Sequence, residues 1–130
     1  MINVKFISDP LSNIPNKPTF IFLDEVVEKK FWMLGELYAC DVEYIIEKVI
    51  PNLDKIMKGE LVQDPTRQDE YLVDYYEFGY DATIIDFYKD KCIINYDFWQ
   101  SKFEAPSEFI YEFMKEWAKH LEYWKKNINN

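Results

Sequence analysis

The sequence predicts an α+β domain spanning residues 1–130, in which an antiparallel β-sheet of four to five strands packs two main helices on one face. Three observations support this fold class. Residues 41–58 and 105–127 repeat apolar side chains at helical spacing. Residues 70–98, between them, form a three-strand meander of β-branched and aromatic runs bounded by turn signals. With 48% hydrophobic and 30% charged residues, the chain has the composition of one folded domain with its own core.

The first forty residues give the weakest signals. Residues 2–8 predict a short strand, and residues 9–18 predict a loop because they contain three prolines. Residues 19–23 are typical of an extended segment. For residues 24–38 two interpretations stay open, because the apolar spacing fits a helix whereas a glycine, a β-branched pair and several aromatic residues favour a strand. We expect a strand near 27–35.

Both expected helices carry terminal signals. Asp41 can cap the start of the first helix, and Gly59 can end it. Pro51 falls inside this run and removes one backbone hydrogen bond, so we expect a kink or two helices end to end. Pro106 suits the first turn of the last helix. The expected buried stripes are Val42, Ile45, Ile46, Val49, Ile50, Leu53, Ile56 and Met57 in the first helix, and Ile110, Phe113, Met114, Trp117, Leu121 and Trp124 in the last.

The meander should place its apolar side chains on one face. We expect strands near 70–78, 81–88 and 91–98, joined by two-residue turns at Gly79–Tyr80 and Lys89–Asp90. Because side chains alternate along a strand, these turns decide which residues share a face. The expected core face carries Leu72, Tyr76, Phe78, Ile85, Phe87, Cys92, Ile94, Tyr96 and Phe98, interrupted by Asp74 and Thr83. A one-residue bulge at Gly79 would exchange the two faces of the first strand, so that its predicted core residues would face outward.

Negative charge is concentrated in the same part of the chain. The net charge is −9, and residues 69–99 hold eight acids and two bases, which is −6 of that total. This acidity argues against nucleic-acid phosphates and anionic membranes as partners. The chain has a single arginine, Arg67, which also argues against single-stranded nucleic acid. The charge favours a basic protein partner; acidity that only maintains solubility is the alternative.

The sheet face opposite the core mixes tyrosines with carboxylates. A face exposed only to water is usually more polar, whereas tyrosine supplies apolar area and a hydroxyl group to protein interfaces. We therefore predict a partner-binding surface that consists of Tyr71, Tyr75, Glu77, Asp81, Asp86, Tyr88, Asp90 and Asp97. The alternative is an ordinary outer sheet face on which tyrosines lie over their neighbours.

The sequence offers no clear catalytic, cofactor-binding or metal-binding pattern. Its one histidine, His120, follows Glu116 and Glu112 on one side of the last helix, which is a weak metal-site pattern and more often a solvated helix edge. Asp74 is the candidate for an acid–base group because it falls on the core face, but a hydrogen-bonded structural carboxylate is the simpler interpretation. We expect no enzymatic activity, no metal and no cofactor.

The two cysteines are consistent with a reducing compartment. The first residues contain no sustained apolar stretch, and no run approaches the length of a membrane span, so we expect a cytoplasmic protein. Cys92 falls in an apolar strand and is most simply a small buried hydrophobic residue. A Cys40–Cys92 disulfide is the expectation only for an exported protein.

The stretch EKKFWMLGELYACDVEYIIEKV, from Glu28 to Val49, resembles the strand, acid-x-x-Tyr and helix passage of small bacterial immunity proteins that protect cells from contact-dependent growth-inhibition toxins. The likeness lies in Asp41 and Tyr44 and in the order of elements along most of the chain. It implies a cytosolic, non-enzymatic inhibitor, monomeric or weakly dimeric, that binds a basic toxin domain, often a nuclease.

Three other functions stay open. The first is a phage or mobile-element protein that mimics DNA to block a host nuclease. The second is a small-molecule-binding or enzymatic α+β domain with a site between sheet and helices. The third is an oligomeric scaffold whose aromatic sheet face pairs with its own copy.

Overall fold

The computed structural model of the protein describes residues 4–9, 11–14, 17–39, 41–63, 72–80 and 82–128. In chain order the elements are β1 (Val4–Ser8), β2 (Pro18–Phe22), α1 (Glu25–Phe31), a 3₁₀ segment (Trp32–Ala39), α2 (Val42–Tyr44), a π-helical segment (Ile45–Val49), α3 (Ile50–Met57), β3 (Val62–Gln63), β4 (Leu72–Val73), β5 (Tyr76–Tyr80), β6 (Thr83–Phe87), β7 (Lys91–Tyr96), a 3₁₀ turn (Asp97–Trp99), β8 (Ser101–Pro106) and α4 (Ser107–Ile128).

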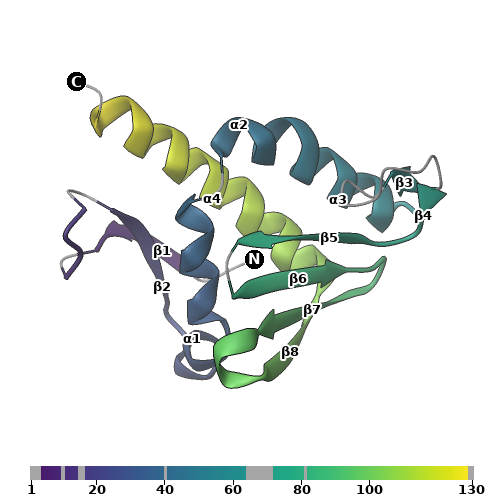
Figure 1. The fold of residues 1–130 in the computed structure, drawn as a ribbon, viewed down its shortest axis with the longest axis horizontal. Helices are drawn as coiled ribbons and strands as arrows, with labels where there is room; N and C mark the ends of the chain where they lie inside the picture. The colour runs from purple at the N-terminus through teal and green to yellow at the C-terminus, as the bar shows by residue number, and fades with distance from the viewer. Residues whose placement is uncertain are drawn as a thin grey trace.

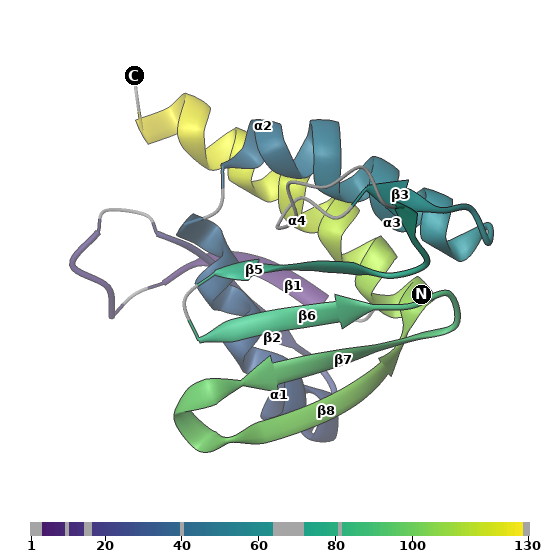
Figure 2. The same ribbon diagram turned by 45° about the vertical axis from the view of Figure 1, so that its right-hand side comes forward.

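A four-stranded antiparallel sheet in the order β5–β6–β7–β8 forms one side of the molecule (Figures 1 and 2). β1 pairs with β2, and β3 pairs with β4, as two further antiparallel pairs. In Figure 2 the sheet lies in front of α1, α4 and the β1–β2 pair, and α2 and α3 run alongside α4. The predicted α+β class with an antiparallel sheet is confirmed.

The core fills the space between the sheet and the helices. Trp117 of α4 stacks on Phe113 with ring centroids 6.0 Å apart, and Phe20 of β2 meets Phe113 edge-on at 4.9 Å. These contacts fasten the β1–β2 pair to α4. Thr83, predicted to interrupt the core face, is buried and donates its hydroxyl to the carbonyl of Met33 at 3.2 Å. The predicted stripe of α4 is buried at Ile110, Phe113, Met114, Trp117 and Leu121, and Trp124 is half-buried.

The expectation of a strand near 27–35 is wrong. The side chain of Asp24 accepts hydrogen bonds from the backbone N–H groups of Val26 and Val27, at 2.9 and 3.1 Å, and so caps α1. The 3₁₀ segment that follows buries Met33, Leu34 and Leu37 completely. The apolar spacing of Val27, Phe31 and Leu34 fits the helix that forms, whereas the β-branched and aromatic residues that favoured a strand express a preference that tertiary packing overrides.

The helical run after Asp41 is interrupted next to Pro51, as predicted. The run enters a π-helical turn in which the N–H of Ile50 reaches the carbonyl of Ile45, one residue before the proline. Pro51 has no N–H, and a π turn is one way for a helix to adjust around a missing bond. The side chain of Asp41 caps the start at Glu43 N, 3.2 Å away. Gly59, at φ +81°, ends the run as predicted.

The meander has a different first turn and an additional strand. The turn at Gly79–Tyr80 is wrong, because β5 continues to Tyr80, which pairs with Thr83. Tyr76 therefore pairs with Phe87, where the expected turn would have paired it with Thr83. The partner changes by an even number of residues, so Tyr76, Glu77 and Phe78 stay on their predicted faces. The turn at Lys89–Asp90 is confirmed by the bond from Tyr88 N to Lys91 O, 3.0 Å.

Three residues of the expected core face lie elsewhere. Leu72 is 57% exposed because it belongs to β4, which pairs with β3 outside the main sheet. Phe98 is 69% exposed because β7 ends at Tyr96 and a 3₁₀ turn follows. Asp74 is exposed in the bend between β4 and β5, so it does not interrupt the core. In each case the strand was expected to extend further than it does.

Candidate functional site

The outer face of the four-stranded sheet is the surface turned toward the viewer in Figure 2, with no helix in front of it. The strand register defines its members. They are Glu77, Gly79, Ile84, Asp86, Lys91, Ile93, Asn95, Lys102 and Glu104, all exposed or half-buried. Tyr75 and Tyr88 continue the same face just beyond the ends of β5 and β6. We call this set the outer sheet face.

Tyr75 and Tyr88 form a stacked pair at one end of the outer sheet face. Their ring centroids lie 5.5 Å apart with an interplanar angle of 25°. Tyr75 precedes the buried Tyr76, and Tyr88 follows the buried Phe87. Because side chains alternate along a strand, both rings turn outward. Tyr88 is 39% exposed, and Tyr75 is half-buried. The pair offers a preordered aromatic surface with little side-chain entropy left to lose on binding.

Glu77 and Asp86 lie directly opposite each other on β5 and β6. Like charges in this arrangement destabilise a sheet. Asn95 on β7 supports Asp86, because its amide nitrogen donates to Asp86 Oδ2 at 3.1 Å and to the carbonyl of Ile84 at 3.2 Å. Asp86 is thereby held in position beside a second carboxylate. A cationic group placed between them would reduce their repulsion.

The β7–β8 half of the outer sheet face carries two basic side chains that are not among the predicted partner-binding residues. Lys91 pairs with Glu104 at 3.4 Å, and Lys102 lies on β8 opposite Asn95. The charged residues of the face are thus three acids and two bases, so it is less acidic than residues 69–99 as a whole. The missed signal was the alternation of SKFEA in β8. The prediction gave residues 101–104 no element and placed Pro106 in the first turn of the last helix, whereas β8 extends to Pro106 and α4 begins at Ser107.

The remaining predicted site residues do not gather around this centre. Asp90 lies in the β6–β7 turn, where its carbonyl accepts the N–H of Ser107 at 3.1 Å. Asp97 lies at the other end of β7, and its N–H donates to the carbonyl of Ala82 at 3.0 Å. Tyr71 and Asp81, which are also predicted site residues, lie outside the described residues. The structure therefore brings together Tyr75, Glu77, Asp86 and Tyr88, and places Asp90 and Asp97 at opposite ends of the sheet.

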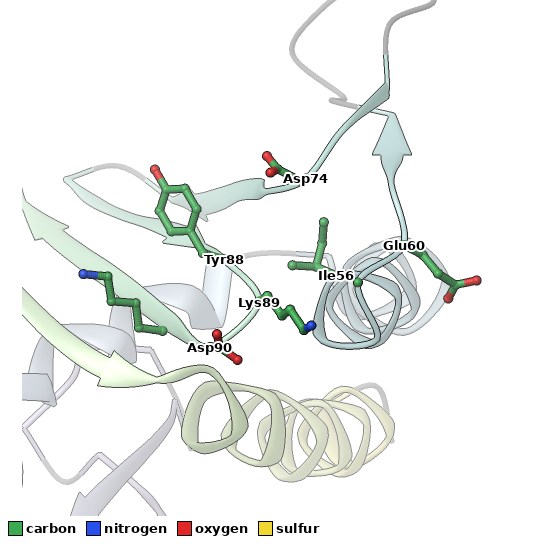
Figure 3. A pocket seen from close by; sticks show the side chains of 8 residues that line it. Ile56, Glu60, Asp74, Tyr88, Lys89 and Asp90 are labelled. Carbon is green, nitrogen blue, oxygen red and sulfur yellow. The ribbon is translucent and has the colours of Figure 1, made fainter.

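An open hollow of about 590 Å³ lies beside Tyr88 (Figure 3). It lies between the end of α3, the bend before β5 and the β6–β7 turn. Its lining residues are Ile56, Gly59, Glu60, Asp74, Tyr88, Lys89, Asp90 and Lys91. The lining mixes both signs of charge, and Asp74 is exposed on it, so its surroundings lack the burial that an acid–base carboxyl needs.

The side chains of His120 and Cys92 are at least partly buried, and each contacts a backbone carbonyl. The ring nitrogen Nε2 of His120 lies 3.1 Å from the carbonyl of Ile7, and burial lowers the pKa of this imidazole. Glu116 and Glu112 pair instead with Lys119 and Lys115, each at 3.3 Å.

Cys92 is a free, buried thiol that donates to the carbonyl of Ala105 at 3.3 Å. Burial raises its pKa to about 12, so it stays protonated and unreactive. Within the described ranges, no group of three or more histidine, cysteine or acidic residues could hold a metal ion.

Comparisons with family profiles, with curated protein sequences and with solved structures found no match to this chain. Of the helices that the structure describes, none has the length and apolar character needed to cross a membrane.

Proposed function

We propose that this protein is a stoichiometric inhibitor of the toxin-immunity kind, which binds a basic protein through its outer sheet face. The observation that carries the proposal is the stacked Tyr75–Tyr88 pair beside the opposed carboxylates Glu77 and Asp86. Rigid tyrosines supply most of the contact energy in many interfaces, and carboxylates select a cationic partner. The resemblance of residues 28–49 to immunity proteins supports the same class, although its strand is helical here.

Two physical steps make up the proposed mechanism. The net charge of −9 first attracts a basic partner and raises the association rate at low ionic strength. A lysine or arginine of the partner then binds beside Glu77 and Asp86, which are direct cross-strand neighbours and together attract a cation. Inhibition follows because a docked protein of this size covers the partner's active site or the approach of its substrate. The proposed activity requires no chemistry from this chain.

The test begins with the gene next to this one, since an immunity gene lies beside its toxin gene. The encoded toxin domain is expressed in cells with or without this protein, and growth and complex formation are measured. We expect rescue by the wild type and loss of rescue by Tyr88→Ala combined with Asp86→Asn. Tyr123→Ala combined with Glu122→Gln, on the exposed side of α4, is the matched control and should rescue fully. Equal rescue by both double variants would rule out the outer sheet face.

The hollow beside Tyr88 favours a second candidate, a ligand-binding domain. Its volume of about 590 Å³ lies within the range of small-molecule sites, and its mixed charges suit a zwitterionic ligand. Thermal-shift screening with amino acids and short peptides tests this candidate. A shift that Asp74→Asn removes and Tyr75→Ala leaves intact would support it over the inhibitor.

A further inference from the structure

We propose that the chain forms a two-fold symmetric homodimer by antiparallel pairing of β8 with β8 of a second copy. β8 is an edge strand, because the sheet order ends with it. Among the strands that the structure describes, none lies beyond it in Figures 1 and 2. An edge strand presents backbone donors and acceptors that can pair with another chain. This dimer does not depend on the function proposed above.

The hydrogen-bond alternation shows which residues of β8 face the open edge. Tyr88 N bonds to Lys91 O, so the backbone groups of Lys91 point toward β6. In an antiparallel sheet the next residue, Cys92, then points toward β8, and it pairs with Ala105. Two residues further along each strand the pattern repeats, so Phe103 also bonds inward. The N–H and C=O groups of Lys102 and Glu104 therefore point outward from the sheet.

The residue after them is consistent with this assignment. Pro106 pairs with Lys91 in the register and has no N–H to donate. Proline is tolerated in a strand where the missing N–H faces an edge. Lys102 and Glu104 are both exposed, whereas Phe103 between them is half-buried and meets Phe31 of α1 at 6.4 Å. The edge is thus polar on its outer side and apolar beneath.

Charge selects one register for the pairing. Outward-facing residues must pair with outward-facing residues to form hydrogen bonds. Pairing Lys102 with Lys102 of the second copy places two lysines opposite each other. Pairing Glu104 with Glu104 places two glutamates opposite each other, and it also puts Pro106, which has no N–H, where a backbone donor is needed. Pairing Lys102 with Glu104 of the second copy makes two opposite-charge pairs about an axis through Phe103. The strand is therefore self-complementary in one register only.

The side chains are available for these pairs. Among the described residues, Lys102 takes part in no ion pair, and Glu104 bonds only to the exposed Lys91 at 3.4 Å. An exposed pair of this kind is weak and can be exchanged for one across the interface. On the inner side the two copies of Phe103 would meet at the axis, where cross-strand aromatic pairs are favourable.

Sedimentation velocity on the full chain, over a wide concentration range up to millimolar, tests the proposal. We expect concentration-dependent dimerisation of the wild type. Lys102→Glu makes the edge doubly acidic and Glu104→Lys makes it doubly basic, so each variant alone should dimerise at least about tenfold more weakly. An equimolar mixture of the two should restore dimers as heterodimers, because each acidic residue then faces a lysine.

Two further variants separate this interface from general charge and from folding. Lys126→Glu, on the exposed surface of α4, changes the net charge by the same amount as Lys102→Glu. This variant should dimerise as the wild type does. Glu104→Pro removes one outward N–H without touching the bonds to β7, and should abolish the dimer while circular dichroism stays unchanged. A wild type that is monomeric throughout, or single reversals without effect on dimerisation, would overturn the proposal; the charges of β8 then serve to keep edges apart.

Discussion

A double-mutant cycle at Glu77 and Asp86 measures how strongly these two carboxylates interact in the absence of a partner. The two carboxylates are direct cross-strand neighbours, and pairs in this position contribute about 0.2–1 kcal/mol, with like charges destabilising. We therefore expect a repulsive coupling energy of about 0.5 kcal/mol from Glu77→Gln, Asp86→Asn and the double variant at low salt. High salt should reduce it, because Glu77 is exposed.

The cycle is needed because Asp86→Asn alone has two effects of opposite sign. It removes the repulsion, and it also weakens the hydrogen bond from Asn95 at 3.1 Å, which is stronger to a carboxylate than to a neutral amide. The second effect is present with either residue at position 77 and cancels in the cycle. Urea unfolding at two salt concentrations gives the four free energies. A coupling of zero, or an attractive one, at low salt would refute the argument that a cation relieves this site.

Three further predictions concern the fold. Gly79→Ala should lower the free energy of unfolding by about 2 kcal/mol or more, because an added Cβ would lie 2.1 Å from the carbonyl oxygen of Thr83 and the hairpin backbone must move. Urea unfolding measures this loss, and a loss of only a few tenths of a kcal/mol would contradict the strand register. The stability should fall as the pH drops from 6.5 through the lower folded pKa of His120, since the unfolded state then binds the proton more readily; thermal unfolding of His120→Gln should lack this component. Burial raises the pKa of the Cys92 thiol to about 12. In a Cys40→Ser background this thiol should therefore react with a thiol reagent only as fast as the protein unfolds. Rapid labelling of the folded protein would show that Cys92 is not buried.

The sequence was most informative for α4 and the meander, each of which buries one face. The stripe of α4 was predicted because Phe113, Trp117 and Leu121 follow helical spacing and the opposite side of the helix meets water. The faces of the meander were predicted despite a misplaced turn, because an error of an even number of residues preserves alternation. An error of one residue, such as a bulge at Gly79, would have exchanged Tyr75 and Tyr76.

The sequence was least informative where two local signals disagree or where an element depends on distant partners. In residues 24–38 the apolar spacing fitted a helix, but the β-branched and aromatic residues favoured a strand, and packing of Met33, Leu34 and Leu37 in the core decided for the helical form. β8 is a strand because β7 lies beside it, and SKFEAP alone leads directly into a helix. Its omission also left Lys102 and Glu104 out of the predicted site, but their charges cancel. The outer sheet face looked more acidic than it is because the predicted site included Asp90 and Asp97, from the ends of β7, and left out Lys91.

This mixed charge bears on the choice between a protein partner and DNA mimicry. A surface that imitates a phosphate backbone needs a regular series of negative charges. Here Glu77 and Asp86 are acidic on β5 and β6, but Lys91 and Lys102 break the series on β7 and β8. Strands lie about 4.8 Å apart, so a partner that buries the usual ~800 Å² per side covers all four. Such a partner must offer cations to the β5–β6 half of the face and accommodate the lysines of the β7–β8 half. This requirement favours an inhibitor of one specific protein over a DNA mimic that binds nucleic-acid enzymes in general.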